Sequence, residues 1–135
     1  MCLWVVIILA DGCKKTEPVP DYPQLVGNWE GTTSQGIGIN ISITTIKGIL
    51  YVSGYDFSVY TSTGFQSYQW TNMYGIVSLN GLQFSISLGS GSAGPAFLNG
   101  TFNLTNITLD GNFAVYPPGN TTDLTTGYYS CNHVK

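Results

Sequence analysis

Apolar and polar residues alternate along most of the chain from about residue 24 onward. The clearest run covers residues 37–44, where isoleucine occupies every second position from Ile37 to Ile43. A period of two places these side chains on one face of an extended strand. The chain then reverses near residues 45–48, and residues 49–52 resume an apolar pattern. This segment therefore predicts a β-hairpin.

Turn residues separate several further alternating segments. Asn80-Gly81 divides residues 77–79 from residues 82–88, and this dipeptide favours the two positive φ angles of a type I′ turn. Asp110-Gly111 is expected inside a strand, at a bulge, because the alternation continues through it. The other strands expected are residues 98–104 and 107–115, which flank Thr105-Asn106, and residues 124–134.

No stretch of ten or more residues has the spacing of an amphipathic helix. Strands joined by tight turns predict an all-β fold, an antiparallel up-and-down meander of about eight strands. We expect the meander to be closed, or nearly closed, as a barrel, because closure removes strand edges that would otherwise aggregate.

The N-terminal residues have a separate pattern. The apolar run of residues 3–10 is too short to cross a bilayer and suits a signal peptide. Gly12-Cys13-Lys14-Lys15 resembles the lipobox of bacterial lipoproteins, those of Bacteroidota in particular, in which the cysteine is acylated. The resemblance implies a signal peptide over residues 1–12, a lipid bilayer as partner through Cys13, and an outer-membrane location. The alternative is a buried strand at residues 3–10 with an ordinary thiol at Cys13.

Residues 13–23 follow as a tether, since prolines at 18, 20 and 23 prevent a helix there. The domain then opens with Gly27-Asn28-Trp29, which resembles the Gly-x-Trp motif at the first strand of lipocalins. The resemblance implies a lipocalin-like barrel over residues 24–135, with a cationic side chain from the last strand over the Trp ring. The chain has no arginine, so only Lys135 could take that position.

Composition restricts the possible partners. Charged residues make up only 8% of the chain and the net charge is −3, with four lysines as the only strong cations. Phosphate backbones bind through lysine and arginine, so nucleic acid is excluded as a partner.

Catalytic residues are sparse. Cys131 and His133 share a face of the last expected strand and are the one nucleophile-and-base pair that the sequence offers. No carboxylate is near in sequence to orient the histidine, and a zinc site needs three or four ligands. We therefore expect no enzyme activity, no metal and no cofactor.

Aromatic residues are concentrated between residues 51 and 74. Tyr68, Trp70 and Tyr74 share one strand face, and together with Trp29 they are the ligand-binding residues we expect at the barrel mouth. Tyr and Trp combine a flat apolar body with a polar tip, which suits an apolar small molecule or a glycan. The alternative is that this stripe is barrel core. The protein would then be a structural or protein-interaction lipoprotein of the envelope with a filled barrel.

Overall fold

The computed structural model describes residues 21–71, 77–88, 94–119 and 122–135. Within them the chain forms strands and a single turn of 3-10 helix, Pro23–Leu25. The strands are β1 (Gly27–Thr33), β2 (Gly38–Ile46), β3 (Ile49–Thr61), β4 (Gly64–Thr71), β5 (Val77–Ser78), β6 (Gln83–Leu88), β7 (Ala96–Asn103), β8 (Thr108–Val115) and β9 (Thr125–His133).

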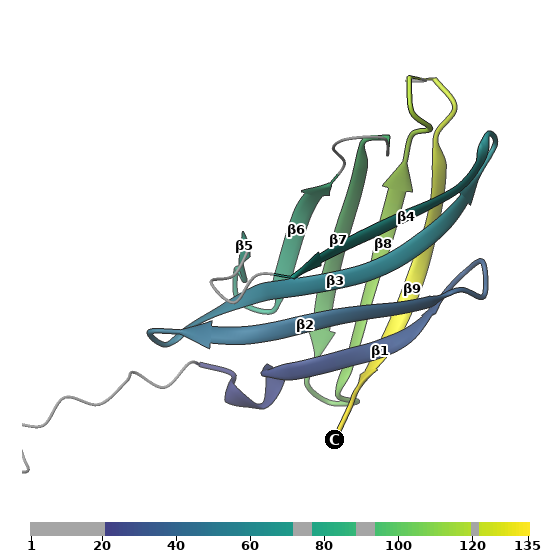
Figure 1. The fold of residues 1–135 in the computed structure, drawn as a ribbon. Helices are drawn as coiled ribbons and strands as arrows, with labels where there is room; N and C mark the ends of the chain where they lie inside the picture. The colour runs from purple at the N-terminus through teal and green to yellow at the C-terminus, as the bar shows by residue number, and fades with distance from the viewer. Residues whose placement is uncertain (1–20, 72–76, 89–93, 120–121) are drawn as a thin grey trace, which may run out of the picture.

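The strands form one antiparallel sheet that curls into a nearly closed barrel (Figure 1), which confirms the predicted fold class. The order is β4-β3-β2-β1-β9-β8-β7-β6, so neighbours in sequence are neighbours in space and the first strand pairs with the last. In the described residues, β4 and β6 are the two ends of this order, and the seam of the barrel lies between them.

Side chains link the two sides of the seam where backbone pairing is absent. The Tyr68 hydroxyl donates to the Gly94 carbonyl oxygen at 2.7 Å, and the Gly94 N–H donates to Gln66 Oε1 at 2.9 Å. Both side chains come from the inner face of β4, and both are buried. Tyr68 therefore contributes to barrel closure.

The predicted hairpins are confirmed at β2–β3 and β7–β8. Lys47 and Gly48 both have positive φ at the first of these turns. Ile107 was expected inside a strand, but it has a φ of 54° and β8 begins one residue later. Asp110-Gly111 does lie inside β8 in continuous register with β7, so the bulge expected there is absent. A register shift occurs instead between β2 and β3, at Ser42/Ile43.

The Asn80-Gly81 turn forms differently from the prediction. The residues of β5, which precede this turn, pair with β3 rather than with β6. Only Asn80 forms a β-bridge across the turn, to Gln83. Gly81 has a φ of 63°, whereas Asn80 does not have a positive φ, so the type I′ geometry is wrong. A single positive φ at the first central residue is the pattern that glycine supports in a type II′ turn.

The barrel interior is filled with large side chains. Among those at most 2% exposed are Trp29, Phe57, Phe102, Leu98, Leu109 and Tyr129. They come from both halves of the meander and form one cluster. Burial of this apolar surface is the main stabilising contribution to the fold.

Trp29 lies at the centre of the contacts between the first and last strands. Its indole N–H donates to the Leu25 carbonyl oxygen at 2.9 Å, and its ring meets Phe102 edge to face at 4.9 Å. The ring of His133, with its centroid 4.8 Å away, takes the position over the indole that was expected for Lys135. His133 Nε2 lies 2.9 Å from the Val26 carbonyl oxygen and donates to it.

Candidate functional site

The predicted ligand-binding residues lie in different environments. Trp29 and Tyr68 are core residues, 0% and 5% exposed. Trp70 is half-buried and stacks nearly parallel on Tyr55, its partner across β3 and β4, with 6.5 Å between ring centroids. Tyr74 lies outside the described residues, as does Cys13. The structure therefore places Tyr68 and Trp70 on one face of β4, as predicted, and their ligand-binding role stays a prediction.

Cys131 and His133 also share a face of β9, the inner one. Burial, with smaller contributions from the charges of Asp110 and Glu30, raises the pKa of the Cys131 thiol to about 12. The thiol is therefore protonated at neutral pH, whereas the nucleophilic form of cysteine is the thiolate. Among the described residues, no group of three histidine, cysteine or acidic side chains is placed to hold a metal ion.

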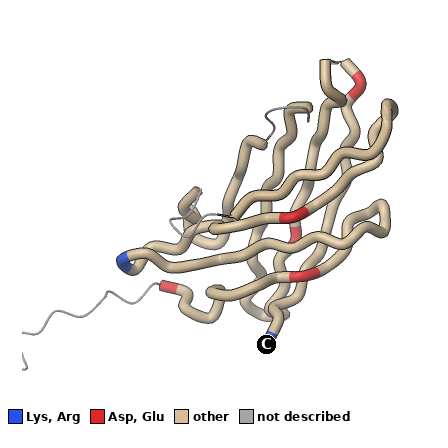
Figure 2. Tube along the Cα trace, viewed as in Figure 1, with Lys and Arg blue, Asp and Glu red and all other residues tan. Residues whose placement is uncertain are grey.

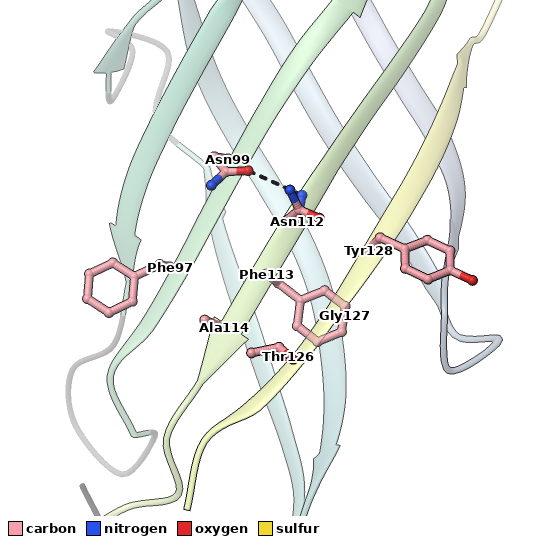
Figure 3. Close-up of a pocket in the computed structure, with 8 residues that line it drawn as sticks. All are labelled: Phe97, Asn99, Asn112, Phe113, Ala114, Thr126, Gly127 and Tyr128. Atoms are coloured by element: carbon pink, nitrogen blue, oxygen red, sulfur yellow. Dashed lines mark hydrogen bonds between the residues drawn. The ribbon is translucent and has the colours of Figure 1, made fainter. Parts of the chain in front are cut away.

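A hollow of about 420 Å³ lies on the outer side of β7, β8 and β9 (Figure 3). Its volume falls in the range of small-molecule sites in proteins. Eight residues line it: Phe97, Asn99, Asn112, Phe113, Ala114, Thr126, Gly127 and Tyr128. None of them is charged, so the hollow offers aromatic rings, the amides of two asparagines and the hydroxyl groups of Thr126 and Tyr128.

The register of the three strands explains how the hollow forms. Phe97, Ala114 and Thr126 are paired side by side across β7, β8 and β9, and Asn99, Asn112 and Tyr128 form the next row. The large rings of Phe97 and Tyr128 lie on opposite sides of the hollow (Figure 3). The smaller side chains between them leave the space open.

Both aromatic residues are unusually accessible for their size. Phe97 is 47% exposed and Tyr128 is 66% exposed. The backbone of Tyr128 is held by Ser34: its N–H donates to Ser34 Oγ at 3.1 Å, and its carbonyl oxygen accepts from the Ser34 N–H at 2.7 Å. The turn between β1 and β2 thus fixes the strand position from which Tyr128 projects.

Asn99 is held in the same way from two sides. Its side-chain oxygen accepts the Asn112 backbone N–H at 3.2 Å, and its carbonyl oxygen accepts the Tyr129 hydroxyl at 2.8 Å. The Asn99 NH₂ group is therefore oriented by the fold. Within the described part of the chain, the side chains of Asn112 and Tyr128 make no hydrogen bond.

The charged residues that Figure 2 marks in the described part of the chain are few, and none of them lines this hollow. The charged residue nearest to it in the strand register is Asp110, which lies on β8 two residues before Asn112 and on the same outer face. Its carboxylate accepts a hydrogen bond from the Thr108 hydroxyl at 3.1 Å. A carboxylate beside a hollow that lacks cations disfavours an anionic ligand. The chemistry of the hollow therefore fits an uncharged ligand that has both hydroxyl groups and apolar faces.

The sequence analysis did not predict this hollow, because it considered the aromatic residues concentrated at residues 51–74 and not the isolated aromatic residues of later strands. Phe97 and Tyr128 occupy positions on the solvent-facing side of their strands, where polar residues alternate with the core residues. Each precedes a buried residue, Leu98 and Tyr129 respectively. A large aromatic residue out of phase with the core is the signal that could have found them.

Comparisons of the chain with models of protein families, with curated proteins and with solved structures found no match. The resemblance to lipocalins that the sequence suggested therefore stays a prediction. Among the described residues, no helix has the length and apolar character needed to cross a membrane.

Proposed function

We propose that this protein is a lipid-anchored binding module of the bacterial cell envelope, and that its ligand is a neutral glycan held on the outer side of β7, β8 and β9. The single observation that carries the ligand class is the uncharged hollow flanked by the exposed rings of Phe97 and Tyr128. Sugars have apolar ring faces and many hydroxyl groups. Aromatic rings match the former, and the amides of Asn99 and Asn112 match the latter.

The proposed ligand lies outside the barrel, away from the mouth residues expected from the sequence. Trp29 and Tyr68 already have partners in the core: the Trp29 indole bonds to Leu25, and the Tyr68 hydroxyl bonds to Gln66 and Gly94. A ligand at either residue would have to displace those contacts, whereas Phe97 and Tyr128 face solvent.

Affinity electrophoresis tests the ligand class. The protein would be run in gels that contain a neutral polysaccharide (β-glucan, xylan, mannan or starch), with polygalacturonate as an anionic control. We expect at least one neutral polysaccharide to retard the protein and the anionic polymer not to do so. Tyr128→Ala should weaken the retardation about tenfold, the equivalent of about 1.4 kcal/mol of binding free energy.

Tyr60→Ala is the matched control, because Tyr60 is an exposed tyrosine (60%) on the outer side of β3, outside the hollow. It should bind like the wild type. Retardation that Tyr128→Ala leaves unchanged would refute the site, and the absence of retardation in every neutral gel would refute the ligand class.

The anchor is tested separately. The full chain would be produced in a bacterium fed an alkyne-bearing fatty acid, with Cys13→Ser as the control. We expect label on the wild type, in the outer-membrane fraction, and none on the variant. An unlabelled wild-type protein would refute the anchor while leaving glycan binding untouched.

A second candidate function is a structural or protein-interaction lipoprotein. It is supported by the filled interior, in which Trp29, Phe57 and Tyr129 are at most 2% exposed. A protein that is acylated but binds no polysaccharide would favour this candidate.

A further inference from the structure

A second hollow of about 420 Å³ adjoins the first on the outer side of the barrel. It lies over β6 and β7, next to β5, and Asn99 lines both hollows. Its lining consists of Val77, Ser78, Asn80, Gln83, Phe84, Ser85, Asn99, Gly100 and Thr101. This lining, like that of the first hollow, contains no charged residue.

The strand register connects the two hollows. Ser85, Asn99, Asn112 and Tyr128 are direct partners across β6, β7, β8 and β9, so they form one outward row perpendicular to the strands. Three strand spacings of about 4.8 Å give this row a length of roughly 14 Å. Such a row is longer than one sugar ring needs.

The hollows differ in chemistry along this row. The first hollow has the exposed rings of Phe97 and Tyr128, which can stack on the apolar face of a sugar. The second hollow offers the amide of Gln83 and the hydroxyl groups of Ser85 and Thr101, which suit hydrogen bonds to sugar hydroxyls. Asn99 stands at the junction with its amide held by Asn112.

From this geometry we infer that the ligand is an extended neutral oligosaccharide or polysaccharide chain. One sugar stacks in the aromatic hollow at Tyr128, the chain crosses Asn99, and its continuation lies in the polar hollow at Gln83 and Ser85. This inference rests on the proposed glycan-binding function and adds the length and the path of the ligand.

Isothermal titration with oligosaccharides tests the path. The ligands would be the disaccharide through the hexasaccharide of whichever neutral polysaccharide retards the protein. We expect affinity to rise with length until the second hollow is filled. Gln83→Ala should weaken hexasaccharide binding roughly three- to tenfold, as expected for the loss of one or two hydrogen bonds, and leave disaccharide binding unchanged.

Ser85→Trp fills the second hollow and should reduce the affinity for the hexasaccharide to that for the disaccharide. Tyr128→Ala should weaken both, and Tyr60→Ala should weaken neither. Circular dichroism would confirm that each variant retains the β-sheet spectrum.

The outcomes separate the two proposals. Equal affinity for all lengths, or a Ser85→Trp variant that binds the hexasaccharide like the wild type, would overturn the extended path and leave the aromatic site in place. If no oligosaccharide of any length binds, the glycan-binding function fails together with the path.

Discussion

Tyr128 and Tyr129 are neighbours in β9, yet they belong to opposite regions of the molecule. Tyr129 lies in the interior, 2% exposed, and its ring extends across Gly111 and Gly100, where a Cβ atom would come within 2.6 Å of it. Tyr128 lies on the outer side and is 66% exposed. The same type of side chain thus packs in the core or faces solvent, depending on which face of the strand it occupies.

The two regions also meet at one residue. The Tyr129 hydroxyl bonds to the Asn99 carbonyl oxygen from the inside, while the Asn99 side chain lines the outer hollows. The packed interior therefore positions the outer surface, and the two faces should respond differently to the same substitution.

The largest difference is expected when each tyrosine is replaced by alanine. Tyr129→Ala removes a buried ring and should lower the free energy of unfolding by about 3–5 kcal/mol. Tyr128→Ala should change it by less than about 0.5 kcal/mol, because its side chain is mostly in solvent. Urea unfolding followed by fluorescence measures both. Similar losses in the two variants would contradict the assignment of the faces.

A smaller loss is expected from Gly100→Ala. The added methyl group would meet Phe84, Tyr129 and Leu109 side-chain atoms within 2.8 Å. The resulting overpacking should cost about 1–3 kcal/mol in the same unfolding measurement. Gly38→Ala is the control, since a Cβ at this β2 position contacts no atom closer than 4.0 Å. An equal loss of stability in both variants would show that the interior beside Tyr129 can accommodate an added methyl group.

The buried thiol of Cys131 on the inner face should make the stability of the protein depend on pH. Burial raises the pKa of Cys131 from an ordinary value of 9.0 to about 12, so the thiol binds its proton more tightly in the folded state. This contribution to stability is complete below pH 9 and is lost as the pH rises toward 12. Tm should fall across this interval, and it should fall less steeply for Cys131→Val. Identical slopes would contradict the prediction.

A modest loss is expected at Tyr60, which lies on the outer side of the barrel like Tyr128 but packs on Phe65 with 4.7 Å between ring centroids. Tyr60→Ala removes one cross-strand aromatic pair and should cost about 0.5–1 kcal/mol of stability. Unfolding in urea measures this loss, and polysaccharide binding should stay at the wild-type level. A binding defect would show that exposed aromatic residues act together regardless of position.

Much of the fold could be predicted from local pattern. Alternation at residues 37–44, 98–104 and 107–115 predicted β2, β7 and β8, and the meander could be predicted because each of these hairpins joins neighbours in sequence. The partner of β5 could not be predicted in this way. β3 extends beyond β4, and residues Tyr51 and Val52 are left to pair with β5. That choice depends on the lengths of distant strands rather than on Asn80-Gly81.

The candidate site was less accessible to sequence reasoning. Its two exposed aromatic residues, Phe97 and Tyr128, are 31 positions apart, and the space between them depends on which small residues of β8 and β9 fall in register. The sequence predicted the site in the dense aromatic segment at residues 51–74 instead. Phe57 and Tyr68 of that segment are core residues whose rings stack on each other.

The pairing of β1 with β9 has a consequence for the order of events in folding. Trp29 and His133, direct partners in this pairing, are separated by most of the described sequence. The closing contacts around the indole can form only after His133 has been synthesised, however early the hairpins between them have formed. Contacts this distant in sequence make folding slow, so newly made chains should spend a measurable time as open sheets that proteases and chaperones can reach.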